Sequence, residues 1–288
     1  MQIKKVKHLQ ISQSSNCCSG FILQLLLIAV FTLQFSNRSL CQGVTVNPSR
    51  VFFNLAPNQA GSKIIQITNP GNEPIVFNTY LKDWYRDSLG IKVYSDTGSS
   101  PTSNASWLHI SPAQVEILPG QTKEITVYMK VPSNAKPVTN SMLFLSQINE
   151  QKPIYDNTGG KKISIHIKLE VGVHVYNVQP QFTKKEFTFL SFEDRGVIND
   201  STRRLAVKVK NLGEIPADAF IRLELTNKTT GDELKIAPQV ISLLPNAEQI
   251  IYFSIPARLE KGKYLATSIL DFGEDSDLKV AEKAIEYE

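Results

Sequence analysis

The chain has 288 residues and a formal net charge of +4. Its first 41 residues contain four basic side chains and no acidic one, which leaves 27 basic and 27 acidic side chains in the remainder. A balanced remainder has no basic excess of the kind that binds phosphates, so nucleic acid is excluded as a partner. The length allows two domains of ordinary size, each with a core of its own.

The first 41 residues have the layout of an export signal. A basic beginning is followed by an apolar run from Gly20 to Phe35 and by a polar segment that ends at Cys41. We expect removal of residues 1–41 and export of the mature protein. An uncleaved anchor helix is the alternative, because the basic segment is long and the apolar run is borderline in length. A lipoprotein is disfavoured because Leu40, which is not small, precedes the cysteine.

All cysteines of the protein, Cys17, Cys18 and Cys41, lie within this leader. The mature protein therefore has no disulfide to stabilise it and depends on apolar cores.

The mature protein opens with strand patterns. Residues 44–55 form a strand interrupted by Pro48, a residue found at sheet edges and at switches between sheets. Residues 63–84 predict a strand, a turn at Asn69-Pro70-Gly71 and a second strand. Residues 85–106 predict an elaborated loop around one short strand.

Three more strands follow in the first half. Two are expected between Trp107 and Pro132, joined through Pro119-Gly120, and one from Ser141 to Ile148. The segment 149–162 reads as a long connection.

The most regular segment runs from Lys162 to Val178. Its apolar residues occupy every second position, which predicts one strand rather than a helix: Ile163, Ile165, Ile167, Leu169, Val171, Val173 and Val175. Such a strand would extend about 50 Å, so one end should project beyond its own sheet and offer an edge to a partner. The alternative is an ordinary last strand with its apolar face wholly inside its own core.

The second half repeats the pattern of the first. Short alternating runs separated by Gly, Pro, Asn or Asp continue from residue 180 to Phe272, as in an all-β sandwich. Two blocks recur in the same order: Ile67–Pro74 matches Val209–Pro216, and Gln114–Pro132 matches Gln239–Pro256. We therefore predict two tandem immunoglobulin-like sandwiches, residues 43–179 and 180–288.

The sequence offers little chemistry for catalysis or metal binding. The mature histidines are His109, His166 and His174, and the last two would be about 26 Å apart on one strand, too far to share a metal. No motif for a nucleophile, a metalloprotease or a phosphate loop is present. We expect no enzyme, no metal and no cofactor.

Four motifs together carry a family resemblance. They are P-S-R-V-F-F from Pro48, N-P-G-N-E-P from Asn69, P-A-Q-V-E-I-L-P-G-Q from Pro112, and the long alternating strand. With them the protein resembles the PapD-like periplasmic chaperones of pilus assembly. The resemblance implies two immunoglobulin-like domains in a boomerang arrangement, whose cleft binds a pilus or fimbrial subunit and lends it an edge strand. That strand would be residues 162–170, with Ile163, Ile165, Ile167 and Leu169 contacting the subunit.

The resemblance also implies a clamp for the subunit's C-terminal carboxylate. Arg50 matches the family's cleft arginine, but the family's cleft lysine is missing, and Gly172 or His174 takes its place depending on registration. His174 would donate one hydrogen bond to the carboxylate. The implied partners are pilus subunits, an outer-membrane usher and a second copy of this protein bound through the donor strand. A non-enzymatic structural or adhesive protein of the cell envelope, built from the same modules, is the alternative.

Overall fold

The computed structural model describes residues 43–149, 154–156, 163–165, 167–273 and 277–288. The predicted leader and His166 lie outside the described residues. The described part is all-β except for one 3₁₀ turn, Ala105–Trp107. No helix in this part is long and apolar enough to cross a membrane.

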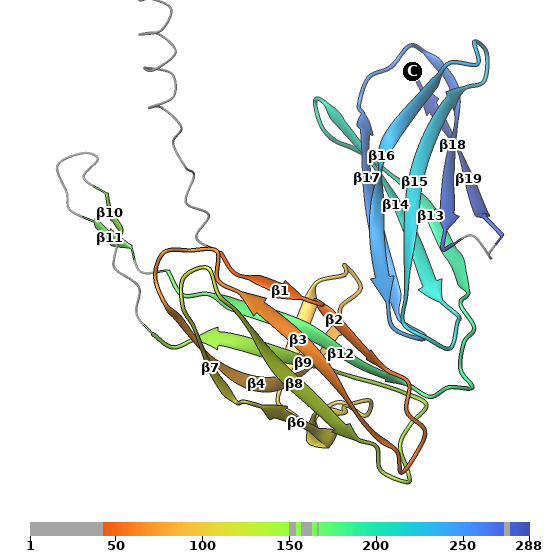
Figure 1. Cartoon of the computed structure of the whole chain (residues 1–288). Coiled ribbons are helices and arrows are strands. Elements are labelled where there is room, and N and C mark those ends of the chain that lie inside the picture. The colour runs from red at the N-terminus through yellow and green to blue at the C-terminus, as the bar shows by residue number, and fades with distance from the viewer. Residues whose placement is uncertain (1–42, 150–153, 157–162, 166, 274–276) are drawn as a thin grey trace, which may run out of the picture. The chain divides into compact units, whose positions relative to one another are not determined.

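The first sandwich has two facing sheets (Figure 1). One has the strand order β1-β3-β8-β6, and the other has the order β2-β12-β9-β4-β5 with β7 paired to β4. Their strands are β1 (Thr45–Asn47), β2 (Arg50–Phe53), β3 (Ala60–Thr68), β4 (Ile75–Arg86), β5 (Lys92–Ser95), β6 (Leu108–Ser111), β7 (Gln114–Ile117), β8 (Thr122–Lys130), β9 (Val138–Gln147) and β12 (Glu170–Val178).

The second sandwich pairs a sheet of order β13-β14-β17 with one of order β16-β15-β18-β19. Its strands are β13 (Phe187–Asn199), β14 (Thr202–Asn211), β15 (Ala217–Asn227), β16 (Glu233–Leu243), β17 (Glu248–Pro256), β18 (Gly262–Asp271) and β19 (Lys279–Tyr287). The fold is therefore two immunoglobulin-like sandwiches, as predicted. Strand β19 was not foreseen, because its apolar and charged residues do not alternate: Lys279 and Lys283 share the inward face with Ile285 and Tyr287, and Val280 is exposed.

Alternation in the sequence builds each core. In the first sandwich the inward residues of β3, β8, β9 and β12 are completely buried: Ile65, Ile67, Ile125, Val127, Leu143, Leu145, Val173 and Val175. Each buried side chain of this size contributes about 1.5–3 kcal/mol through removal of apolar surface from water. Two such cores can stabilise a protein whose described residues include no cysteine.

Two prolines mark places where the backbone passes from one sheet to the other. Pro48 separates β1, which pairs with β3, from β2, which pairs with β12 in the opposite sheet, so the prediction for this proline is confirmed. Pro112 does the same between β6, which pairs with β8, and β7, which pairs with β4. The prediction of two strands between Trp107 and Pro132 is therefore wrong, since the region has three. Proline has no N–H to donate to the hydrogen-bond ladder of a sheet. Pro112 therefore interrupts a segment whose apolar pattern alone predicts one continuous strand.

The predicted single strand from Lys162 to Val178 is also interrupted. Strand β12 begins only at Glu170, residues 167–169 are irregular, and β11 (Ile163–Ile165) pairs instead with β10 (Ile154–Asp156). The ladder of β12 stops because its partner β9 ends at Gln147, whose side chain accepts a hydrogen bond from the Leu169 N–H at 3.1 Å. Alternation specifies the faces of a strand but not how far its partner extends.

A buried asparagine ties together the turns of the first sandwich. The Asn69 side chain is completely buried and donates to the carbonyls of Glu73 (2.8 Å) and Ile117 (3.0 Å). Its oxygen accepts from the Gly71 N–H at 2.9 Å, and its own N–H donates to the Gln121 carbonyl at 3.0 Å. One side chain thus joins the β3–β4 turn to the β7–β8 turn.

The second sandwich repeats this arrangement. Asn211 donates to the carbonyls of Ile215 (2.9 Å) and Leu243 (3.1 Å) and accepts from Gly213 at 2.8 Å. Its N–H donates to the Ala247 carbonyl at 3.1 Å. The equivalent turns therefore have one geometry, as the sequence repeat predicts, although Leu243 stands one residue later than the sequence match places it.

Candidate functional site

Strand β12 has an edge that is only partly covered. On one side, β9 pairs with the whole length of β12, from Glu170 to Val178. On the other side, β2 pairs with β12 only from His174 to Asn177. No described strand pairs with Glu170–Val173 on the β2 side. We call these four residues the open edge.

The backbone of the open edge points toward the vacant side at alternate residues. The His174 N–H donates to the Ser49 carbonyl at 3.1 Å, so His174 faces β2. By the period of two, the N–H and C=O groups of Glu170 and Gly172 face the same side, where no described strand is present. Such groups can template an incoming strand.

Arg50 is located where the open edge ends. It is the first residue of β2, and its register partner is His174. Its Nη1 donates to an Asp218 carboxylate oxygen at 2.6 Å, with side chains 37% and 44% exposed. An exposed pair of this kind contributes about 0.2–1 kcal/mol. A guanidinium has five N–H donors, so Arg50 can bind a further carboxylate.

His174 is buried against aromatic rings. The Trp84 ring meets it edge-on at 4.8 Å, and the Tyr176 ring lies parallel to it at 6.0 Å. These contacts hold the imidazole in the outer layer of the sheet, next to Arg50.

Burial lowers the pKa of His174 to about 4, and the positive charges of Lys92, Arg50 and Arg86 act in the same direction. A hydrogen bond with the Ser49 backbone opposes this change but does not outweigh it. The imidazole is therefore neutral at pH 7 and adds no cation to the site.

The structure also settles which residue is opposite Arg50. His174 is its register partner, and Gly172 lies two residues away. A Cβ at Gly172 would lie 3.1 Å from the Met142 sulfur and 3.3 Å from a ring carbon of Phe144, so this position has little space for a side chain. Neither position that the sequence offered for the missing lysine supplies an ammonium group.

Lys92 is a residue that sequence reasoning missed. It opens β5 and is the register partner of Arg86 at the end of β4. Burial lowers its pKa, and the charges of Arg86 and Arg50 lower it further. Nothing in the sequence signals this position, because it depends on how the β4–β5 hairpin folds over the sheet.

An aromatic layer covers the outer face of this sheet. Tyr80 stacks on Phe144 at 5.0 Å, Tyr94 meets Phe144 edge-on at 5.1 Å, and Phe52 stacks on Tyr176 at 4.8 Å. Buried Trp84, Met142, Phe144 and Tyr176 form its centre. These rings hold the β4–β5 hairpin against the sheet, so that the Arg50 charge acts on the pKa of Lys92.

The residues predicted to contact a partner differ in their surroundings. The backbone of Ile163 and Ile165 is paired with β10, and the side chain of Ile167 is 42% exposed. Leu169 is half-buried and packs against the core of the first sandwich. Their role in binding stays a prediction.

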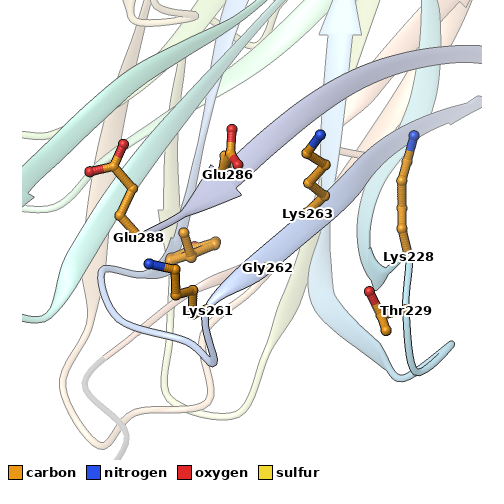
Figure 2. Close-up of a pocket in the computed structure, with 8 residues that line it drawn as sticks. Lys228, Thr229, Lys261, Gly262, Lys263, Glu286 and Glu288 are labelled. Carbon is orange, nitrogen blue, oxygen red and sulfur yellow. The ribbon is translucent and has the colours of Figure 1, made fainter.

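A hollow lies at one end of the second sandwich. It measures about 580 Å³ and is lined by Lys228, Lys261 and Lys263 together with Glu286 and Glu288 (Figure 2). All five charged side chains are exposed, and the two signs are mixed. The described residues contain no group of three His, Cys, Asp or Glu side chains placed to hold a metal ion.

No protein-family model matches the sequence, and no curated protein sequence matches it. Its structure is similar to those of PapD-like fimbrial chaperones. A protein from the Salmonella enterica complex of SafA pilin with the SafB chaperone is 11% identical; the match spans 83% of this protein and 95% of the other, with a TM-score of 0.44. The Pseudomonas aeruginosa CupB2 chaperone is 12% identical, with spans of 84% and 100% and a TM-score of 0.41.

A protein from the Acinetobacter baumannii CsuC–CsuE complex of chaperone and tip subunit is 12% identical, with spans of 77% and 92% and a TM-score of 0.41. At these identities the similarity concerns the fold. Function has to be argued from the residues of this protein.

Proposed function

We propose that this protein is a non-enzymatic periplasmic chaperone that caps pilus- or fimbrial-type subunits by lending them an edge strand. The observation that carries the proposal is the open edge of β12, which ends at Arg50. Residues 43–179 are the subunit-binding domain in this proposal, and residues 180–288 are the second domain.

An incoming strand would first use the open edge. The backbone groups of Glu170 and Gly172 offer ladder hydrogen bonds without any rearrangement of β12. Further upstream, the added strand would continue along the edge of β11 that has no described partner, where Ile163, Ile165 and Ile167 contact the subunit. Main-chain bonds supply affinity in this mode, and the alternate apolar side chains supply specificity.

Arg50 gives the added strand a defined end. Strand β2 already pairs with β12 from His174 onward, so an added strand that runs parallel to β12 must end before Arg50. A subunit whose C-terminus lies at this place meets a guanidinium that can grip its carboxylate with two hydrogen bonds. An internal segment of a partner could not end here, which favours a free C-terminus as the ligand.

The other expected partners depend on the same edge. A second copy of this protein could add its own strand there when no subunit is bound, and an outer-membrane usher would receive the loaded complex. Export through the leader would place all of them in one compartment. No specific observation favours the alternative of a structural or adhesive envelope protein.

Capture of a subunit tests the proposal. The full-length protein would be co-expressed with the pilus-type subunits of its own genome, each tagged at its N-terminus, and recovered from the periplasmic fraction. We expect a subunit to co-purify with the wild-type protein and to be lost with Ile167→Asp, because a buried carboxylate in the partner's groove is costly. Ile64→Asp is the matched control, since Ile64 is also exposed (53%) but lies on β3 in the opposite sheet.

Two results would overturn the proposal. Recovery of no subunit with the wild-type protein would refute subunit capture. Equal recovery with Ile167→Asp and the wild type, both folded, would refute strand donation through this segment.

A further inference from the structure

Three cations lie around the end of the open edge. Arg50 is the register partner of His174, Arg86 is the register partner of Lys92, and the Arg86 guanidinium lies 5.9 Å from the ring centre of Trp84. Trp84 itself contacts His174. Positive groups from β2, β4 and β5 therefore lie on the face of the sheet that carries His174 and Trp84.

Two of these cations have partners. Arg50 pairs with Asp218, and Arg86 donates from Nη1 to the Gly90 carbonyl at 2.7 Å while it lies over the Trp84 ring. Lys92 forms no ion pair or side-chain hydrogen bond with any residue that the structure describes. It is a half-buried ammonium group among like charges.

An unpaired ammonium in such surroundings favours an anion. Like charges and partial burial both disfavour the charged form of Lys92, and a bound carboxylate would relieve both effects. No carboxylate of the first sandwich pairs with it among the described residues. The anion that fits these cations is therefore one that a ligand brings.

We propose that Lys92 is the second cation of the carboxylate site, acting with Arg50 on the C-terminus of the captured strand. This inference rests on the proposed function and adds a residue to it. Lys92 reaches the site from the β4–β5 hairpin and not from β12, where Gly172 and His174 offer no ammonium.

Lys185 is the other lysine to consider. It lines a hollow of about 330 Å³ together with Arg50, Phe52, Tyr176 and Asp218. Its side chain is exposed, whereas Lys92 is half-buried and is the charge that most strongly lowers the pKa of His174. Lys185 is therefore the matched comparison for Lys92.

The test uses the full-length protein and peptides that copy the C-terminal strand of a subunit recovered in the capture experiment, made as the free acid and as the amide. We expect Lys92→Gln to weaken binding of the free-acid peptide about tenfold and to leave the amide nearly unchanged, because only the acid carries the charge. Lys92→Arg should keep most of the affinity, and Lys185→Gln should change neither peptide. Urea denaturation of each variant checks that folding is unaffected.

A second measurement does not depend on substitution. The pKa of Lys92, followed by NMR of the ¹³C-methylated protein, should rise when the free-acid peptide binds and not when the amide binds. A preference for the acid that survives Lys92→Gln, together with an unchanged Lys92 pKa, would overturn the role of Lys92 alone. A wild-type protein that captures no subunit would refute the proposed function, which is a different result.

Discussion

Protonation of His174 should destabilise the folded protein, and the size of the effect follows from its surroundings. Its pKa is lowered from 6.5 to about 4 by burial and by the charges of Lys92, Arg50 and Arg86. The side chain is only 9% exposed, so water screens these effects little. A difference of this size corresponds to about 3 kcal/mol of folding free energy at the acidic limit.

The direction of this pH dependence follows from proton uptake by the folded and the unfolded protein. The unfolded protein protonates His174 as the pH falls through 6.5, while the folded protein keeps it neutral until the pH approaches 4. Between these values the unfolded state binds more protons, so stability falls as the pH decreases. The loss from this residue should be about 2 kcal/mol at pH 5 and should level off below pH 4.

Urea denaturation at pH 7.5 and at pH 5 measures this loss. Carboxylates such as Asp194, whose pKa is lowered by Arg203, also make stability depend on pH, so the comparison is between variants. His174→Asn should remove about 2 kcal/mol of the pH dependence. His109→Asn, the same substitution at an exposed histidine of β6, is the matched control. An identical pH dependence in the wild type and His174→Asn would refute the neutral, buried state of this imidazole.

Two further predictions concern the folding of the sandwiches and the charge at the open edge. Asn69→Ala and Asn211→Ala should each cost about 2–4 kcal/mol in urea denaturation, because each leaves buried backbone groups without partners, and a cost below about 1 kcal/mol for either would contradict this. Asp218→Asn should strengthen binding of the free-acid peptide about 1.4- to 5-fold, since it releases Arg50 from an exposed ion pair. Asp200→Asn, the same change of charge at an exposed site, should have no effect. An equal gain for the amide peptide would contradict competition between Asp218 and the peptide carboxylate for Arg50.

Much of the fold could be predicted because its signals are local. Alternation along residues 171–176 identified the buried face of β12, and Val173 and Val175 are indeed completely buried. The repeated Asn-x-Gly turns predicted equivalent geometry in the two halves, and Asn69 and Asn211 make equivalent hydrogen bonds. These features depend on a few neighbouring residues and on the period of two.

The features that escaped prediction depend on contacts between distant segments. The upstream limit of β12 is set by the end of β9 at Gln147, and the position of Lys92 depends on contacts of the β4–β5 hairpin with the sheet, such as that of Tyr94 with Phe144. Sequence reasoning identified Arg50 through its motif but left its partner on β12 open between Gly172 and His174. Only the register between β2 and β12 decides that question, because a shift of two residues keeps the same face.

The register between β2 and β12 places the Arg50 guanidinium at the end of the open edge. Because β2 begins opposite His174, it fixes both where an added strand must end and where the Arg50 guanidinium is located. A shift of the added strand by two residues would move its terminus about 6.6 Å, beyond the reach of a direct hydrogen bond. In the proposed complex, the charge of Arg50 would therefore select the register of the added strand as well as its free C-terminus. The proposed role of Lys92 follows the same logic, because a second cation would act through its distance from the bound carboxylate and not through the strand that carries it.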